Sequence, residues 1–135
     1  MTDSTYPVRL KANLKRVRAM FQGHVIADTN HALTVLEEGH APVQYFPRED
    51  VEMGFMGKTD RHSRCPYKGE ASYYTLTMEG RIAENAAWSY EQPLSGALAL
   101  NDYIAFYPEA VEVYELSPGE ESLEPRAAHP HLPRP

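Results

Sequence analysis

The sequence is built from short runs of residues in which apolar and polar side chains alternate. The runs are rich in β-branched and aromatic residues and end at Gly, Pro, Asn or Asp, as Arg16–Phe21 ends at Gln22-Gly23. Alternation of this kind is typical of half-buried strands, and the residues that interrupt it are typical of turns. No long segment has the periodicity of an amphipathic helix. The sequence therefore predicts a mainly β fold.

The alternating runs predict a single compact antiparallel β domain of about seven or eight short strands. We expect a meander, then a hairpin, then two final strands. Their predicted bounds are residues 16–21, 24–27, 32–36, 42–46, 71–76, 82–90, 103–107 and 110–114. One short helical turn is predicted at 47–53, because Pro47 suits the first helical position and acidic residues follow it. Residues 54–69, rich in glycine and cations, are predicted to be a long loop, and such loops are often functional.

A chain of 135 residues is long enough to bury one sizeable core and supports a single domain. We predict that this β domain spans residues 15–116 and that residues 1–14 form an N-terminal extension. Residues 117–135 are rich in proline and poor in apolar side chains. Burial of so few apolar groups does not offset the entropy of ordering, so we expect this segment to be a mobile tail.

Composition and charge argue against several classes of partner and cofactor. The formal net charge of −6 argues against nucleic acid binding, although basic residues cluster at 9–18 and 58–68. No apolar run is long enough to span a membrane, and residues 1–5 lack the apolar core of a secretory signal. The single cysteine, Cys65, excludes an internal disulfide and a four-cysteine zinc site within one chain. We therefore expect a cytoplasmic protein with no metal and no cofactor.

The richest concentration of reactive side chains lies at residues 59–69, directly before the predicted hairpin. A hairpin that turns near Gly80 brings Trp88 beside Gly69 and Glu70. An aromatic wall, a thiol and several cations would then meet at one end of the sheet, and this is the composition of a small-molecule pocket. We expect the pocket to hold a small anionic or planar ligand. The predicted ligand-binding residues are Arg64, Tyr67, Lys68, Tyr73, Trp88 and Tyr90.

Cys65 and His62 are candidate catalytic residues. Nearby cations would favour the thiolate form of Cys65, which could act as a nucleophile or redox centre with His62 as its base. The spacing His62-x-x-Cys65 would also suit two metal ligands, but no further ligand lies nearby. Each candidate also has a structural interpretation: Cys65 as a small buried hydrophobe, the aromatic residues as core and Lys68 as a solvated cation.

Four segments, in order along the chain, carry a resemblance to a known family. They are residues 45–51 (Tyr-Phe-Pro-Arg-Glu-Asp-Val), 65–74 (Cys-Pro-Tyr-Lys-Gly-Glu-Ala-Ser-Tyr-Tyr), 87–93 (Ala-Trp-Ser-Tyr-Glu-Gln-Pro) and 104–107 (Ile-Ala-Phe-Tyr). The sequence resembles the bacterial family Domain of Unknown Function 427, which is also labelled nucleotidyltransferase-like. The resemblance implies a compact β domain similar to the β-tent and raises nucleotidyl transfer as an activity. Many β-tent proteins carry a four-cysteine zinc site, and this chain departs from them because it has one cysteine.

The sequence leaves several functions open, of which a ligand-binding module ranks first. One alternative is an enzyme that uses Cys65, or one that performs nucleotidyl or phosphoryl transfer at the basic segment 54–69. Another is a protein-interaction domain whose proline-rich tail contacts a partner. Open β edges also leave a homodimer open. The sequence does not decide whether the protein is an enzyme.

Overall fold

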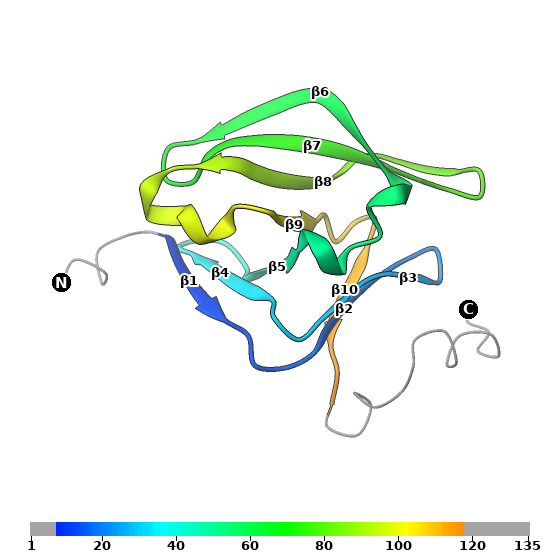
Figure 1. The fold of residues 1–135 in the computed structure, drawn as a ribbon, viewed down its shortest axis with the longest axis horizontal. Coiled ribbons are helices and arrows are strands. Elements are labelled where there is room, and N and C mark those ends of the chain that lie inside the picture. The colour runs from blue at the N-terminus through cyan, green and yellow to red at the C-terminus, as the bar shows by residue number, and fades with distance from the viewer. Residues whose placement is uncertain (1–7, 118–135) are drawn as a thin grey trace.

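The computed structural model describes residues 8–117, which form ten β-strands and three short 3₁₀ turns (Figure 1). The strands are β1 (Val8–Ala12), β2 (Val17–Phe21), β3 (His24–Thr29), β4 (Leu33–Glu37), β5 (Val43–Pro47), β6 (Met56–Cys65), β7 (Gly69–Met78), β8 (Arg81–Pro93), β9 (Tyr103–Phe106) and β10 (Glu112–Glu115). The 3₁₀ turns are η1 (Arg48–Asp50), η2 (Met53–Phe55) and η3 (Ser95–Leu100). The mainly β prediction is confirmed, and η1 is the predicted short helical turn. The predicted mobile tail lies almost entirely outside the described residues.

The strands form two antiparallel sheets. In the larger sheet, hydrogen-bonded neighbours follow the order β1-β4-β5-β9-β8-β7-β6, and in the smaller the order is β10-β2-β3. The predicted meander is therefore divided, because β2 and β3 belong to the small sheet and β4 and β5 to the large one. The chain turns away from the small sheet at Thr29. The Thr29 hydroxyl accepts a hydrogen bond from the His31 N–H (2.9 Å) and donates one to Asp50 (2.7 Å).

Two strands, β1 and β6, lie where the sequence analysis expected none. β1 falls within residues 1–14, the predicted extension, yet it pairs with β4 and Val8 is only 1% exposed. β6 falls within residues 54–69, where the prediction of a long loop is wrong. It is the last strand of the large sheet and pairs only with β7. An edge strand tolerates glycines and charges because one edge and one face meet water, and its composition therefore resembles that of a loop.

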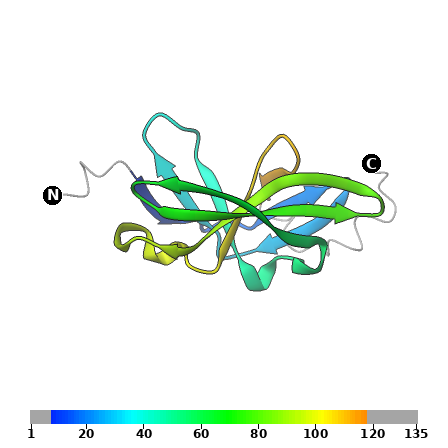
Figure 2. The ribbon, with the colours of Figure 1, turned by 90° about the horizontal axis from the view of Figure 1, so that it is seen from above.

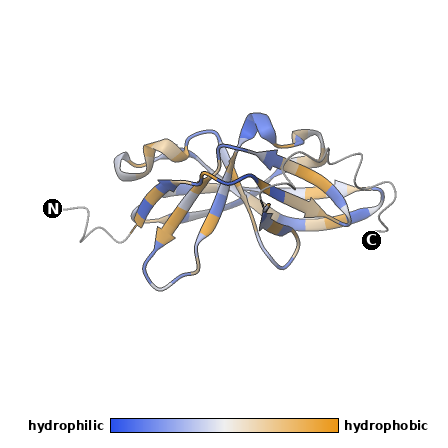
Figure 3. Ribbon diagram, turned by 90° about the horizontal axis from the view of Figure 1, so that it is seen from below, coloured by the Kyte–Doolittle hydropathy of each residue, from blue (hydrophilic) through white to orange (hydrophobic). Residues whose placement is uncertain are grey.

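Alternate side chains of β7 and β8 enter two different cores. The first core lies between the two sheets and includes Phe21 and Phe46. The second lies on the other face of β7 and β8, against β1, β4 and η3, and includes Tyr45. The consecutive residues Tyr73 and Tyr74 point one into each core, Tyr73 into the second and Tyr74 into the first. Figure 3 shows the corresponding alternation of apolar and polar residues along the strands.

The large sheet is strongly curved. Three strands separate β4 from β7 in the sheet order, and in a flat sheet this would place them about 19 Å apart. Glu37 at the end of β4 nevertheless lies 2.5 Å from Lys68, the residue just before β7. Figure 2 shows β7 and β8 twisting along the length of the molecule, with the β4–β5 hairpin beside one end.

Within residues 8–117 no helix is long and apolar enough to span a membrane.

Candidate functional site

The β7–β8 hairpin is present, but its register differs from the predicted one. Trp88 lies opposite Tyr73, and Pro93 occupies the place opposite Gly69 where Trp88 was expected. The register already differs by one residue next to the turn, where Leu76 pairs with Ala83 and not with Ile82, and two irregularities of the β-bulge kind add the rest of the shift by inserting residues into β8 that have no partner on β7. At one of them Asn85 has a positive φ of 51°. Bulges are hard to place from sequence, and most of the error in the predicted register has this cause.

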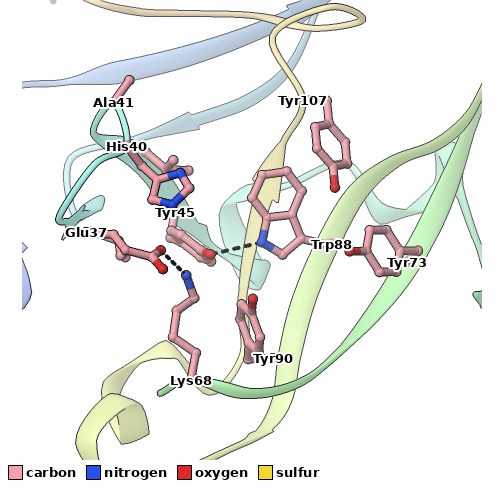
Figure 4. Close-up of a pocket in the computed structure, with 11 residues that line it drawn as sticks. Glu37, His40, Ala41, Tyr45, Lys68, Tyr73, Trp88, Tyr90 and Tyr107 are labelled. Carbon is pink, nitrogen blue, oxygen red and sulfur yellow. Dashed lines mark hydrogen bonds and ion pairs between the residues drawn. The ribbon is translucent and has the colours of Figure 1, made fainter. Parts of the chain in front are cut away.

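Aromatic side chains nevertheless gather around a pocket (Figure 4). The cavity has a volume of about 200 Å³ and lies between the β4–β5 hairpin and strands β7, β8 and β9. Its aromatic lining residues are Tyr45, Tyr73, Trp88, Tyr90 and Tyr107, and its polar lining residues are Glu37, His40 and Lys68. Aromatic walls with a few polar groups are typical of small-molecule sites.

Trp88 is the centre of the aromatic wall. Its indole N–H donates a hydrogen bond to the Tyr45 hydroxyl (2.9 Å), and the two rings meet edge to face at 89°. Tyr107 packs against the indole at a centroid distance of 4.5 Å, and it also lies parallel to Tyr73 at 6.4 Å. Ring pairs of this kind contribute about 0.5–1.5 kcal/mol beyond simple burial. These contacts fix the orientation of the rings before any ligand binds.

Lys68, which we expected to bind a ligand through its charge, is buried and paired. Its side chain is 9% exposed, and its ammonium lies 2.5 Å from the Glu37 carboxylate and 5.5 Å from the centre of the Tyr90 ring. The carboxylate offsets the cost of burying a positive charge. The pair is close to neutral as a unit. It still has hydrogen-bonding capacity, because an ammonium has several N–H donors and a carboxylate has two oxygens.

Gly69 allows the end of β8 to approach the backbone of Lys68. Its φ is +114°, and an added Cβ would lie 3.1 Å from the Gln92 carbonyl oxygen and 3.2 Å from the Leu94 nitrogen. The Leu94 N–H donates a hydrogen bond to the Lys68 carbonyl (2.9 Å). The glycine therefore positions Lys68 by letting two backbone segments pack closely.

The other predicted site residues do not line this cavity. His62 and Arg64 share one face of β6, where they lie 3.5 Å and 3.9 Å from Glu70. Cys65 is half-buried against the second core, on the opposite face of the strand from His62. A His62–Cys65 dyad is therefore not formed. Tyr67 is 41% exposed in the turn between β6 and β7.

Burial keeps the phenol groups of the pocket neutral. It raises the pKa of Tyr45 and that of Tyr90 far above the ordinary value of 10.0. Burial, followed by a hydrogen bond with Tyr73, raises the pKa of Tyr107 to about 12. At neutral pH these hydroxyls are protonated, so they offer a ligand hydrogen bonds but no charge.

A second polar cluster lies on the opposite face of β7 and β8, beside the first core. Arg48 donates hydrogen bonds from Nη2 to the Tyr74 hydroxyl (3.2 Å) and the Glu91 carboxylate (3.2 Å). The same nitrogen lies 3.5 Å from the Ser89 hydroxyl. Lys58 donates to the other Glu91 oxygen (2.7 Å), and the Tyr74 hydroxyl also donates to Glu91. These groups satisfy one another and tie η1 to β7 and β8.

The sequence analysis missed several pocket residues. Tyr45 and Tyr107 lie inside the segments that carry the family resemblance, so a signal for them existed. Glu37 and His40 lie at the turn between β4 and β5, where polar residues are expected on any fold. No local pattern relates this turn to Lys68, which is 31 residues beyond Glu37. Only the curvature of the large sheet brings them together.

A family model supports the resemblance noted in the sequence. The model described as Domain of unknown function (DUF427) matches residues 9–117. The chain belongs to the DUF427 family. The DUF427 match covers all the residues that line the pocket and all the strands except the first residue of β1. No curated protein matches the chain.

Metal-assisted nucleotidyl transfer, the activity suggested by the nucleotidyltransferase-like label of DUF427, commonly uses clustered carboxylates as metal ligands. Within residues 8–117 no group of three or more His, Cys, Asp or Glu side chains is arranged to hold a metal ion. Asp50 of the 45–51 motif accepts a hydrogen bond from the Thr29 hydroxyl instead. The described part of this DUF427 domain presents an aromatic pocket as its candidate site.

Proposed function

We propose that the protein binds a small planar molecule in the pocket around Trp88. The observation that carries this proposal is a cavity of about 200 Å³ that combines five aromatic side chains with the pair of buried Lys68 and half-buried Glu37. Flat aromatic walls favour a flat ligand, because a ring contacts them over its whole face. Pockets for drug-sized ligands span about 300–1,000 Å³, so a cavity of this size suits a smaller molecule.

The Glu37–Lys68 pair indicates which groups the edge of the ligand carries. A donor and an acceptor lie side by side in the pocket wall, 2.5 Å apart. A carboxamide or lactam also presents a donor beside an acceptor and can bond to both members of the pair. A purely apolar ring would bury these polar groups without giving them new partners, and this costs binding energy. The favoured ligand is therefore a planar ring with an amide-like edge.

The other predicted functions have less support among residues 8–117. Cys65 has no base beside it, because His62 lies on the opposite face of β6. Several cations of the basic segment 54–69 are already paired, Arg64 with Glu70 and Lys58 with Glu91. A partner-binding role of the proline-rich tail falls on residues outside those described. Ligand binding is the function that the geometry favours.

Trp88 is the only tryptophan of the chain, so its fluorescence and its indole N–H resonance report directly on the pocket. We expect both signals to change saturably when benzamide is added, with a dissociation constant on the order of 1 mM for so small a ligand. Cyclohexanecarboxamide is the matched control, since it has the same amide on a non-planar ring. It is expected to bind much more weakly.

Three variants test whether benzamide binds in this pocket. Glu37→Gln and Tyr107→Leu are expected to weaken benzamide binding about tenfold or more, because they remove an acceptor and part of the aromatic wall. Arg64→Gln changes an exposed residue paired with Glu70 and serves as the control. The proposal fails if benzamide gives no saturable signal. It also fails if cyclohexanecarboxamide binds as well as benzamide, or if neither pocket variant weakens binding.

A further inference from the structure

Arg61 lies beside Tyr73, one of the aromatic residues that line the pocket. Its guanidinium carbon is 4.7 Å from the centre of the Tyr73 ring, and Tyr73 lies parallel to Tyr107. Burial raises the pKa of Tyr107, and the positive charge of Arg61 opposes this rise, so the guanidinium acts on both rings. Tyr73 and Tyr107 both line the cavity. Arg61 is thus a neighbour of the pocket that the sequence analysis did not select as a ligand-binding residue.

Arg61 contacts Tyr73, a residue of the pocket wall, whereas Arg64 contacts Glu70 on the other face of β6. The pairing of β6 with β7 is irregular between Lys58 and His62, so the face of Arg61 is assigned by its contact with the Tyr73 ring. Ser63 confirms which face this is, because its hydroxyl lies 2.7 Å from the Tyr73 hydroxyl. Arg64 is on the other face and lies 3.9 Å from Glu70.

The charge of Arg61 is not offset by any ion pair within residues 8–117. The other cations near the pocket or on β6 do have carboxylate neighbours. Lys68 contacts Glu37, and Arg64 and Lys58 contact Glu70 and Glu91. The guanidinium of Arg61 instead lies against an aromatic face and is exposed to solvent. It is therefore available to a ligand in the cavity beside it.

We propose that the ligand of this pocket carries an oxyanion, a carboxylate or a phosphate ester, and that Arg61 binds it at the Tyr73–Tyr107 end. This inference rests on the proposed function, since it assumes that a planar ring occupies the cavity. The ligand would then have two polar ends, an amide-like edge toward the Glu37–Lys68 pair and an oxyanion toward Arg61. Figure 4 shows the corresponding layout, with Trp88 between the Glu37–Lys68 pair and Tyr107.

Arginine suits this role for geometric reasons. A guanidinium presents a rigid fork of donors that matches both oxygens of a carboxylate or phosphate. Its stacking on Tyr73 limits the orientations of that fork, so less entropy is lost when an anion binds. Lys68 is less suited, because Glu37 already neutralises it. Recognition of an anion thus falls to Arg61 and not to Lys68 or Arg64, the two cations predicted from the sequence to bind a ligand.

The test compares ligands that share a ring and an amide and differ at the opposite end. Terephthalamide is neutral there, 4-carbamoylbenzoate carries a carboxylate, and 4-carbamoylphenyl phosphate carries a phosphate ester. Dissociation constants are measured from Trp88 fluorescence and by calorimetry at low ionic strength. We expect at least one of the two anions to bind about tenfold more tightly than terephthalamide. The tighter of the two anions identifies the kind of oxyanion.

Variants test whether Arg61 causes the tighter binding of the anions. In Arg61→Gln the advantage of the anion over terephthalamide is expected to disappear, while terephthalamide itself binds as before. Arg61→Lys is expected to keep part of the advantage, and the control Arg64→Gln all of it. The inference is overturned if neither anion binds more tightly than terephthalamide, or if Arg64→Gln removes the advantage as well. In those cases terephthalamide still binds and the proposed function stands, whereas absence of binding by all three ligands overturns both.

Discussion

The two faces of the β7–β8 hairpin carry similar residue types and differ in what those residues do. On the pocket face, Tyr73, Trp88 and Tyr90 surround a cavity of about 200 Å³. On the opposite face, Tyr74 and Glu91 lie in a cluster held together by Arg48. Both faces combine aromatic rings with an ion pair. On the pocket face the polar groups Glu37 and Lys68 line the cavity.

The two faces differ in how many hydrogen-bond acceptors each cation already contacts. Arg48 faces three acceptors, of which Glu91 also accepts hydrogen bonds from Lys58 and Tyr74. A ligand would have to displace one of these partners. On the pocket face Lys68 has one carboxylate partner, and Arg61 has none among the described residues. Hydrogen-bonding capacity that is not used within the protein makes the pocket face the better candidate for a binding site.

The largest expected effect is a loss of stability at alkaline pH, which involves phenols of both faces because burial also raises the pKa of Tyr74. Burial raises the pKa of Tyr45, Tyr90 and Tyr107 in the folded protein above the ordinary value of 10.0. Their contribution to stability is complete below pH 10 and is lost as the pH rises toward the folded-state pKa values, because the unfolded chain then releases protons that the folded chain retains. Each buried phenol lowers the free energy of unfolding by about 1.4 kcal/mol per pH unit in this range.

We therefore expect the domain to unfold between about pH 10 and 12, in step with tyrosinate absorbance. Urea unfolding followed by circular dichroism at a series of pH values measures the decline. Tyr90→Phe removes one of the titrating groups and is expected to reduce the slope. An unchanged slope in this variant, or tyrosinate formation without any loss of stability, would show that the pocket phenols are not held neutral by the fold.

Glu37→Ala is expected to lower the free energy of unfolding by about 3 kcal/mol, because it leaves the ammonium of Lys68 buried without its carboxylate. The double variant Glu37→Leu with Lys68→Met removes both charges and is expected to recover most of this loss. Chemical denaturation measures both effects. If the double variant is as unstable as Glu37→Ala, the pair does not act as one buried unit, and the contrast with the solvated pairs of β6 disappears.

Arg48→Met breaks the cluster on the opposite face and is expected to cost about 2 kcal/mol, since Tyr74 and Glu91 lose a shared donor. The cost is smaller than for Glu37→Ala because the carboxylate left behind, Glu91, is 30% exposed and keeps Lys58, whereas the ammonium of Lys68 is only 9% exposed. Benzamide binding in the pocket should be unchanged in the folded variant. Weaker binding, with the fold intact, would mean that the two faces are coupled.

The strands with clear alternation were predictable from sequence, and those without it were not. The runs at β2 to β5 and the β7–β8 hairpin follow from period-two patterning. Strand β6 could not be predicted from this patterning, because an edge strand exposes its charges much as a loop does. The register of β8 was also inaccessible, since bulges depend on the curvature of the whole sheet.

The residues of the candidate site also divide into those that could be predicted from the sequence and those that could not. Tyr73, Trp88, Tyr90 and Lys68 were selected from the hairpin and the segment before it, and all four line the cavity. Their predicted roles as ligand-binding residues remain predictions. Glu37, by contrast, meets Lys68 only because the large sheet bends, and no short-range pattern encodes that bend.

Acid is expected to weaken the cluster of the opposite face through Glu91. Burial alone would raise the pKa of Glu91, but hydrogen bonds from Lys58 and Tyr74 outweigh it and lower that pKa below the ordinary value of 4.5. The contribution of Glu91 to stability is therefore present above pH 4.5 and is lost as the pH falls through the lower folded-state pKa. Unfolding in urea between pH 5 and 3 measures it. Glu91→Gln should flatten this dependence, and an equally steep decline in the variant would assign it to other carboxylates.

The smallest expected effect is that of Arg64→Gln on the outer face of β6. Arg64 and Glu70 are 69% and 55% exposed and lie 3.9 Å apart, so their attraction is screened by water and salt. The free energy of unfolding should change by less than about 0.5 kcal/mol, and benzamide binding should not change at all. Calorimetry and urea unfolding measure the two quantities on the same sample. A tenfold loss of binding would mean that Arg64 reaches the cavity around the edge of β6, and Arg61 would then no longer be the arginine that distinguishes the pocket face from the solvent face.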